Sequence, residues 1–522
     1  MPEPVTLDGG SLTIEQVRAV AVNRAEVKLA DASRQRMLRT RDVVAGIVER
    51  GEVVYGVTTG FGKLSEVAIP HDRLSELQVN LVRSHSAGVG PLLPEREVRA
   101  MMLLRSNVLA KGYSGARPDL VDLLLGMLNR GLFPPIPEQG SVGASGDLAP
   151  LAALGVSMIG EGLLYAGRGT TAELEADSIA GSSISPIARP AAQVLRSCGL
   201  EPVTLGPKEG ITLINGTQAH TAVAALAISD ARVLWHTAHV AGAMSLEALL
   251  GTPVPFDERI HDARGQTGQA QSAALLRRLL EDSELRESHR VGDPRVQDAY
   301  CLRCMPQVHG PVFDALAWIG EIVSRELNAA TDNPLVFENG EILSGGNFHG
   351  LAVANALDLL AIVLTNLATI SERRIDRLVH PDFNQGLPAF LSHEPGVHSG
   401  FMMAQVTAAA LASECKVLSH PASVDTIPTD GNREDVVPMS MGAAWKARRV
   451  VANVQRVLAI ELMCAAQAID YRAPLKPGRG VQSAHAMVRR IIEPLDADRV
   501  LSPDIELLAH EIGAGRFAGG DA

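Results

Sequence analysis

The sequence predicts a mainly α-helical protein whose second half is a bundle of long helices. From residue 210 onward, apolar residues recur at helical spacing, in places over more than about 25 residues, as in helix bundles rather than α/β layers. The composition, 46% apolar and 20% charged over 522 residues, is that of a globular protein. A soft boundary in or just after the polar region 167–190 predicts an N-terminal part, residues 1–205, and a helical part, residues 206–522.

Short elements with clear end signals are predicted in the N-terminal part. Residues 5–7 fit a strand, and Thr13 with Gln16 forms a capping box that opens a short helix. Asp31 is expected to cap the next helix, which ends at Gly51.

Loops and helices alternate in the segment that follows. Residues 52–55 are expected to form a short strand that leads into the glycine-rich loop 56–62. Helices fit residues 95–111 and 118–129, and both are closed by a glycine. Asp147 is expected to cap the next helix.

Five long helices are predicted in the rest of the chain. They cover residues 217–250, 310–328, 350–379, 400–418 and 439–469. The last helix has an apolar face that we expect in the core, formed by Val450, Val454, Val457 and Leu458.

Charge and apolar patterns argue against nucleic acid and membrane partners. Lys and Arg total 47 against 59 Asp and Glu, and the 3% of aromatic residues supply few rings for base stacking. The most apolar stretch, residues 350–370, is interrupted by Asn355, Asp358 and Asn366. Five cysteines without a regular framework and the absence of a signal pattern predict a cytoplasmic, reducing environment.

Two motifs resemble ligand sites but fail on their details. The loop 56–62 has five residues between its outer glycines, and no hydroxyl residue follows Lys63, so it does not fit a nucleotide phosphate loop. Cys301 and Cys304 have the spacing of a metal pair, but a second pair is not evident. We therefore expect neither a nucleotide nor a metal.

The triplet Ala144-Ser145-Gly146 is the most informative motif. One interpretation is a loop before a helix, with Ser145 or Asp147 as its cap. The chemical interpretation is that the Gly146 nitrogen attacks the Ala144 carbonyl, and that Ser145 is dehydrated to an exocyclic methylidene. The ring would be a strong electrophile, and the positive end of the following helix would favour the negative charge it accepts.

Residues 140–150 closely resemble the signature of the aromatic amino acid ammonia-lyases, which carry a 4-methylideneimidazol-5-one group. The resemblance extends along nearly the whole chain, in motifs that match in order at residues 55–62, 84–90, 214–218, 296–303 and 344–350. It implies the long-helix bundle of the ammonia-lyase type, which is fumarase- and aspartase-like, with an N-terminal part that carries the prosthetic-group loop. It also implies a homotetramer whose active sites combine loops from several subunits.

The resemblance implies a site around a group formed autocatalytically from the triplet. The catalytic residues would be Tyr55, Ala144, Ser145, Gly146, Asn215 and Tyr300. The substrate-binding residues would be His85, Gln297, Arg303, Phe348 and Glu434.

Each implied residue has an expected role toward a small amino acid substrate. Tyr55 would remove the β-proton, for which its pKa near 10 must fall. Arg303 would hold the substrate carboxylate with two hydrogen bonds. Asn215, Gln297 and Tyr300 would position the amine and the electrophile. Phe348 would line the pocket near the substrate ring.

Within the family, the motifs indicate elimination of ammonia from L-histidine to give trans-urocanate. His85 and Glu434 would face the imidazole, because a carboxylate accepts a hydrogen bond from its N–H. Two neighbours depart from the histidine branch: Arg433 stands where Gln is typical, and residues 436–438 replace its usual His-Val-Ser.

Three alternatives stay open. One is a tyrosine or phenylalanine ammonia-lyase, or a 2,3-aminomutase, of the same family. Another is the fumarase and aspartase group, whose Ser-Ser-x-Met-Pro-x-Lys signature is absent; the closest run is residues 181–186. The third is a non-catalytic oligomeric scaffold, against which the intact triplet and Tyr55 argue.

Overall fold

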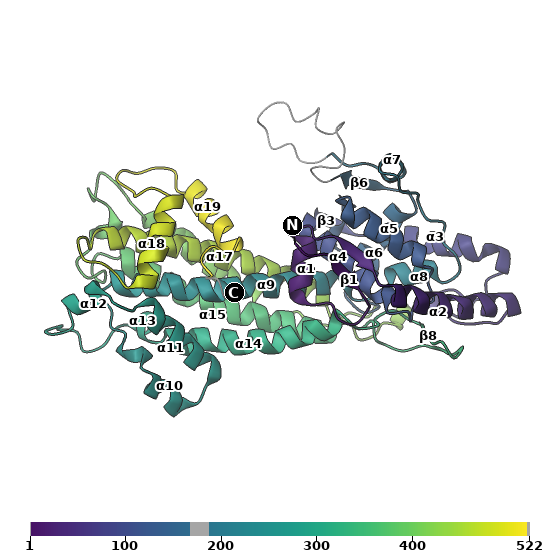
Figure 1. Cartoon of the computed structure of the whole chain (residues 1–522), viewed down its shortest axis with the longest axis horizontal. Helices are drawn as coiled ribbons and strands as arrows, with labels where there is room; N and C mark the ends of the chain where they lie inside the picture. Colours follow the sequence, from purple (N-terminus) through teal and green to yellow (C-terminus); the bar gives the residue numbers. More distant parts are fainter. Residues whose placement is uncertain (1, 167–186, 519–522) are drawn as a thin grey trace. The chain divides into compact units, whose positions relative to one another are not determined.

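The computed structural model describes residues 2–166 and 187–518 and is mainly helical, as predicted (Figure 1). The chain forms two compact units, each assembled from three segments. The first unit comprises Met1–Leu226, Gly320–Leu357 and Pro421–Trp445, and the second comprises Ala227–Ile319, Asp358–His420 and Lys446–Ala522. The contiguous division at residue 205 stays a prediction, and most of the region 167–190 lies outside the described residues, as do residues 181–186.

The first unit packs short helices around an apolar core. Its helices are α1 (Ile14–Ala21), α2 (Asp31–Arg50), α3 (Leu74–His85), α4 (Glu95–Ala110), α5 (Pro118–Asn129), α6 (Leu148–Met158), α7 (Ala191–Ser197) and α8 (Glu209–Ile214). The helix α4 is buried along almost its entire length, so it lies at the centre of this core.

Small sheets join distant loops of the first unit. The strands are β1 (Val5–Leu7), β2 (Val27–Leu29), β3 (Val89–Leu92), β4 (Leu132–Phe133), β5 (Pro137–Gln139), β6 (Leu163–Ala166), β7 (Arg189–Pro190), β8 (Leu335–Val336) and β9 (Ile342–Leu343). The strands β1 and β2 are parallel, with Val5 opposite Val27, whereas the pairs β3–β5 and β8–β9 and the sheet β4–β6–β7 are antiparallel.

The predicted start of the chain is largely confirmed. The strand at residues 5–7 is present, and the Thr13 hydroxyl accepts from the Gln16 N–H in a complete capping box. The helix that ends at Gly51, which adopts the left-handed conformation, is also present. The capping role of Asp31 was wrong, because Asp31 is the first helical residue and the N-cap, Ala30, makes no side-chain bond.

Two further local predictions need correction. Residues 52–54 have no regular structure and residues 55–58 form a turn, where the Thr58 hydroxyl donates to the Glu52 carbonyl oxygen at 2.7 Å and accepts from the Val54 N–H at 2.9 Å. Asp147 stands at the N-cap position of α6, but its carboxylate makes no capping bond there. It is bound instead by Ser141 and His220.

All five predicted long helices are present. They are α9 (Gln218–Ala248), α14 (Met305–Glu326), α15 (Leu351–Val379), α16 (Met402–Leu418) and α17 (Ser440–Asp470). The predicted apolar face of α17 is buried, including Val450 and Val454. Most of each long helix belongs to the second unit, which further contains α10 (Glu258–Arg264), α11 (Thr267–Leu279), α12 (Glu284–Ser288), α13 (Tyr300–Arg303), α18 (Arg479–Ile491) and α19 (Ser502–Gly513).

A buried ion pair joins two long helices of the second unit. Arg374 of α15 donates to Glu461 of α17 through two nitrogen atoms, at 2.5 and 2.9 Å, and neither side chain is exposed. The Ser245 hydroxyl also donates to this carboxylate at 2.7 Å. Loss of either partner would leave a buried charge uncompensated, so the pair couples the two helices.

The helices α15 and α17 are long and apolar enough to cross a membrane by length and composition alone. Most of the apolar window of each helix is buried inside the protein, as is usual for core helices.

Candidate active site

The triplet Ala144-Ser145-Gly146 lies in a tight loop directly before α6. Gly146 has a φ of +73°, and a Cβ atom on it would lie 2.1 Å from the Gly216 carbonyl oxygen, so only glycine fits. The Asn215 side-chain amide donates a hydrogen bond of 2.7 Å to the Ser145 carbonyl oxygen. Ala144 is buried, whereas Ser145 is partly exposed. The loop therefore surrounds Ser145 with small residues and a polarising donor.

Arg105, a buried residue of α4, anchors the main chain of Asn215. Its two terminal nitrogens donate to the Asn215 carbonyl oxygen at 2.8 and 3.1 Å. Burial lowers the pKa of Arg105 to about 10, so the guanidinium stays charged near neutral pH. The anchored main chain leaves the Asn215 side chain directed at Ser145.

Glu434 contacts the triplet directly. One carboxylate oxygen accepts a hydrogen bond from the Ser145 hydroxyl, and the other accepts one of 2.5 Å from the Thr429 hydroxyl. The main chains of Thr429 and Glu434 also pair with each other, which fixes the carboxylate in place. A group that accepts hydrogen bonds is thus held at Ser145 by two hydroxyl donors.

Tyr55 is half-buried near two carboxylates. Burial raises the pKa of Tyr55, a hydrogen bond with the Gly62 main chain lowers it, and the charges of Asp430 and Glu434 raise it. The net direction is upward, because a phenolate here would be a further negative charge in a partly desolvated place. This direction is opposite to the fall that a general base requires.

His85 and Phe348 lie at the ends of two further segments of the first unit. The Nδ1 atom of His85, the last residue of α3, lies 2.9 Å from the Leu81 carbonyl oxygen. A carbonyl only accepts, so this contact places a proton on Nδ1 and leaves Nε2 as an acceptor. Phe348 is half-buried, and the nearby Gly350 N–H donates to the Gly143 carbonyl oxygen at 3.1 Å. That bond joins the segment of Phe348 to the triplet loop.

The second unit carries Gln297, Tyr300 and Arg303. Gln297 is exposed, and Tyr300 is 70% exposed. The guanidinium of Arg303 lies over the Tyr300 ring, 4.7 Å from its centroid, so the two side chains stack on α13. The structure brings these two residues together.

Comparison with known proteins identifies the family. The family described as aromatic amino acid lyase matches residues 12–490. The chain belongs to the aromatic amino acid lyases. A histidine ammonia-lyase of Anaeromyxobacter dehalogenans is 54% identical over 98% of this chain and 99% of its own length.

Solved structures of aromatic amino acid lyases and aminomutases have the same fold. The histidine ammonia-lyase from Trypanosoma cruzi is 42% identical, with a TM-score of 0.87, over 98% of this chain and 94% of that one. The tyrosine aminomutase from Streptomyces globisporus is 39% identical, with a TM-score of 0.89, over 98% of this chain and 97% of that one. The predicted fold and family are therefore confirmed, and the chain is a carbon–nitrogen lyase.

In this aromatic amino acid lyase, Arg433, which precedes Glu434 and stands where Gln is typical of the histidine branch, points to Glu66. The two side chains form an ion pair of 3.3 Å, and both are well exposed. Because Arg433 is engaged there, it does not neutralise the adjacent Glu434 in this structure.

The buried residues that support the triplet loop were not predicted from the sequence. Arg105 had a weak signal, a charged residue directly after the apolar run 100–104 of a helical stretch. His220, which contacts Asp147, and Ser440, which contacts His220, had no signal, because the three residues are far apart in the sequence.

Residues 2–166 and 187–518 contain no group of three or more His, Cys, Asp or Glu side chains that could hold a metal ion. Burial raises the pKa of the Cys301 thiol, which favours its neutral form.

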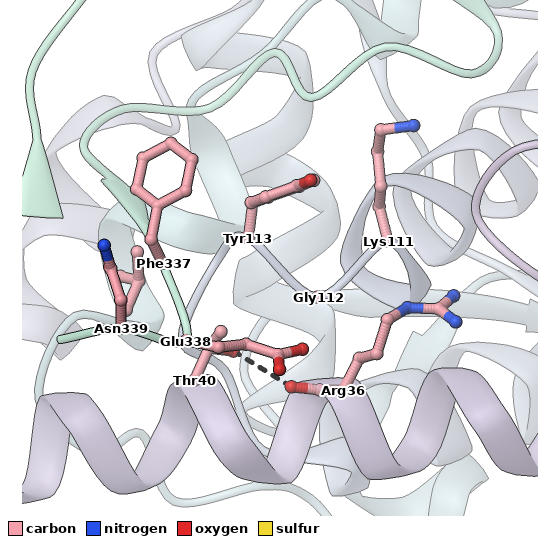
Figure 2. Close-up of a pocket in the computed structure, with 9 residues that line it drawn as sticks. Arg36, Thr40, Lys111, Gly112, Tyr113, Phe337, Glu338 and Asn339 are labelled. Atoms are coloured by element: carbon pink, nitrogen blue, oxygen red, sulfur yellow. Dashed lines mark hydrogen bonds between the residues drawn. The ribbon is translucent and has the colours of Figure 1, made fainter. Parts of the chain in front are cut away.

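A cavity of about 320 Å³ lies elsewhere in the first unit, between α2 and the segment that follows β8 (Figure 2). Its charged side chains are already paired: Arg36 donates to main-chain oxygens, Lys111 donates to Gly9, and Glu338 accepts from Arg39. None of the predicted site residues lines it. This cavity is therefore separate from the candidate active site.

Proposed function

We propose that this lyase eliminates ammonia from L-histidine and releases trans-urocanate. The observation that carries the proposal is Glu434, a carboxylate fixed at the reactive triplet, where it can accept a hydrogen bond from an imidazole N–H. The relatives at 48–54% identity over nearly the whole chain that bear the name histidine ammonia-lyase support the same substrate. His85 is proposed as the second residue that faces the imidazole.

We also propose that the triplet becomes a 4-methylideneimidazol-5-one group. The residues present fit this group, because Gly146 leaves no room for a side chain and Asn215 donates to an oxygen that the ring retains. When formed, the group supplies an electrophile for the substrate amine, which makes ammonia a better leaving group.

The mass of the triplet tests this group directly. The tryptic peptide 131–168 of native protein should be lighter than its sequence by two waters. The Ser145→Ala variant should lack this loss and nearly all activity while it stays folded, because loss of one side-chain hydrogen bond, here to Glu434, costs only about 1 kcal/mol. A peptide of full mass from active native protein would rule the group out.

The chain's own residues bind the substrate and move its proton. Tyr55 is proposed to remove the β-proton, and the ammonium charge of a bound substrate would oppose the two nearby carboxylates and lower its pKa. Arg303 holds the substrate carboxylate in a bidentate geometry. Gln297, Tyr300 and Asn215 orient the amine.

We propose a cytoplasmic homotetramer in which several subunits share each active site. The exposure of Gln297 and of Tyr300, at 70%, supports this assembly, because residues that bind a small substrate must be covered when the site is complete. The free cysteines fit a reducing compartment, and the acidic net charge of −12 fits neither nucleic acid nor an anionic membrane surface.

A second candidate is a tyrosine or phenylalanine lyase, or an aminomutase, on the same fold. The TM-score of 0.89 with a tyrosine aminomutase favours keeping it, as do the substitutions at residues 433 and 436–438. A panel of histidine, tyrosine and phenylalanine, read by the ultraviolet absorbance of the conjugated product, decides between them. Histidine should be turned over best, and equal or better use of tyrosine or phenylalanine would contradict the histidine assignment while leaving the lyase assignment in place.

A further inference from the structure

Asp147, His220 and Ser440 form a fully buried polar network beneath the triplet loop. The three residues come from the loop before α6, the first turn of α9 and the first residue of α17, and none is exposed. The His220 Nδ1 atom lies 2.8 Å from an Asp147 carboxylate oxygen and 3.1 Å from the Ser440 hydroxyl. The His220 main-chain N–H donates to the same carboxylate oxygen at 2.9 Å.

These contacts define the orientation of the His220 ring. A carboxylate only accepts, so the short contact places the proton on Nδ1. The Nε2 atom of His220 is buried and has no hydrogen-bond partner among the described residues. The ring therefore acts through Nδ1, which joins Asp147 to the start of α17.

The network is packed tightly against the triplet loop. The Ser141 hydroxyl donates to the second Asp147 carboxylate oxygen at 2.9 Å and accepts from the Gly143 N–H at 3.1 Å. A Cβ atom at Gly143 would lie 1.8 Å from the Ser440 hydroxyl oxygen. The Asp147 carboxylate thus holds the loop on both sides of the triplet, while Ser440 closes the space below it.

His220 also affects the ionisation and the hydrogen bonding of the Asp147 carboxylate. Burial opposes ionisation of Asp147, but the charge and hydrogen bonds of His220 and the Ser141 hydroxyl leave its pKa below the ordinary value. Without His220, the carboxylate would be buried without this hydrogen-bond partner, or would turn to cap α6, as an aspartate in this position commonly does. Either change would move the main chain next to Gly146.

We propose that His220, held by Ser440, is a positioning residue that keeps Asp147 and the triplet in the conformation from which the prosthetic group forms. This inference rests on the proposed formation of that group. The Asp147 N–H donates to the Gly216 carbonyl oxygen at 2.8 Å, so an anchored Asp147 presses Gly146 against Gly216 and fixes the direction of the Gly146 nitrogen.

The chemistry needs only atoms of the triplet. The Gly146 nitrogen forms a bond to the Ala144 carbonyl carbon, whose oxygen leaves as water with the hydrogens of the Gly146 and Ser145 nitrogens. The Ser145 hydroxyl then leaves as a second water with the Cα hydrogen, and a carbon–carbon double bond remains. No oxidant or further reactant is required.

The test measures formation of the group by mass rather than by turnover. Native protein and variants are made by cell-free synthesis, and the tryptic peptide 131–168 is followed over time for the loss of two waters. His220→Leu removes the Nδ1 donor, whereas His220→Asn keeps an N–H near its position. Thr221→Ala is the matched control, because Thr221 is a buried polar neighbour on the same helix whose hydroxyl has no hydrogen-bond partner among the described residues.

We expect the loss of two waters to be slower by roughly 10²-fold in His220→Leu, since displacement of reacting groups by about 1 Å has effects of this size. His220→Asn should recover most of the native rate, and Thr221→Ala should match native protein. A native rate in folded His220→Leu would overturn the inference. If that variant does not fold, Ser440→Ala decides, because slower formation supports the anchor and a native rate contradicts it. A native peptide of full mass would instead contradict the proposed group itself.

Discussion

The hydroxyl of Ser145 and the carboxylate of Glu434 share one hydrogen bond, and this contact connects two proposed roles. The Ser145 hydroxyl must leave as water for the prosthetic group to form, and Glu434 is proposed to accept a hydrogen bond from the substrate ring. The carboxylate that now accepts from Ser145 would therefore lose one partner when the group forms and become available to an imidazole N–H.

The Tyr55→Phe variant tests the proposed base. It removes one hydroxyl and keeps the ring, so substrate binding should persist while kcat falls by about 10²–10⁴-fold. Steady-state kinetics with histidine, together with the peptide mass that reports the group, separates lost proton transfer from lost group formation. A near-native kcat would show that Tyr55 is not the base.

The Glu434→Gln variant tests specificity. Native enzyme should prefer histidine over phenylalanine by about 10⁴-fold in kcat/KM, because phenylalanine leaves the carboxylate without a partner. The variant should turn over histidine much more slowly, and its preference for histidine over phenylalanine in kcat/KM should be smaller. Since Glu434 contacts Ser145, the peptide mass must first show that the variant has formed the group.

If the Glu434→Gln variant has formed the prosthetic group completely, an unchanged ratio of kcat/KM for histidine to kcat/KM for phenylalanine would exclude Glu434 as the residue that binds the imidazole. An apolar residue at His85, which does not contact Ser145 through a hydrogen bond in this structure, is the matched comparison and should also narrow the ratio.

Single residues show how far the sequence predicts such a site. The triplet and Tyr55 were predictable because each lies in a contiguous motif. The buried network around Asp147 was not, because His220 and Ser440 lie 73 and 293 positions away and are ordinary residues in their own helices. The rise in the pKa of Tyr55 was equally hidden, since it depends on burial and on Asp430.

At the scale of elements, end signals decided which predictions succeeded. Helices with an apolar stripe and a terminal glycine, such as α2 with Gly51, were predicted nearly to the residue. Residues 52–55 were misassigned as a strand because the Thr58 hydroxyl bonds the main chain of Glu52 and Val54 ahead of the turn at residues 55–58, and a strand pattern does not reveal such a competing bond. Asp147 lies at the N-cap position of α6, but its carboxylate is bound by tertiary contacts instead of capping the helix.

The helices α9, α11 and α14 share a buried histidine cluster that makes the second unit sensitive to acid. The Nε2 atom of His239 lies 2.6 Å from the Ser272 hydroxyl, and its ring lies 4.6 Å from the ring of His309. Burial lowers the pKa of His239 to about 3 and lowers that of His309 well below its ordinary value. Both side chains are therefore neutral in the folded protein near neutral pH.

Stability should fall as pH drops from about 6.5 toward 3, because only the unfolded chain binds protons at these histidines in that window. His239 alone should cost about 3 kcal/mol at pH near 4.5. Urea midpoints at pH 7 and 4.5 measure the loss, and His239→Gln should show a smaller drop between the two pH values than native protein. An equal drop would mean that carboxylates, not this cluster, set the acid limit.

At the scale of the whole molecule, the proposed site residues divide between the two units of the chain. Tyr55, the triplet, Asn215 and Glu434 belong to the first unit, and Gln297, Tyr300 and Arg303 belong to the second. Each unit is built from three chain segments, so neither corresponds to a contiguous stretch of sequence. The sequence pattern predicts helices one at a time, and such interleaving of segments depends on contacts that it does not contain.

The proposed sharing of sites between subunits predicts that two inactive variants restore each other's activity. Tyr55→Phe removes the proposed base from the residues of the first unit. Arg303→Gln removes the bidentate partner of the substrate carboxylate from the residues of the second unit. If one site takes these residues from different subunits, random mixing of equal amounts makes about a quarter of the sites fully native. Co-expressed variants with two different tags, purified through both tags, should therefore show about a quarter of native kcat per site at unchanged KM.

Each variant alone should stay inactive, and the double variant Tyr55→Phe/Arg303→Gln mixed with itself controls for residual turnover. Mixed assemblies that are no more active than the single variants would show that both residues act within one chain, and the shared-site assembly would then be wrong.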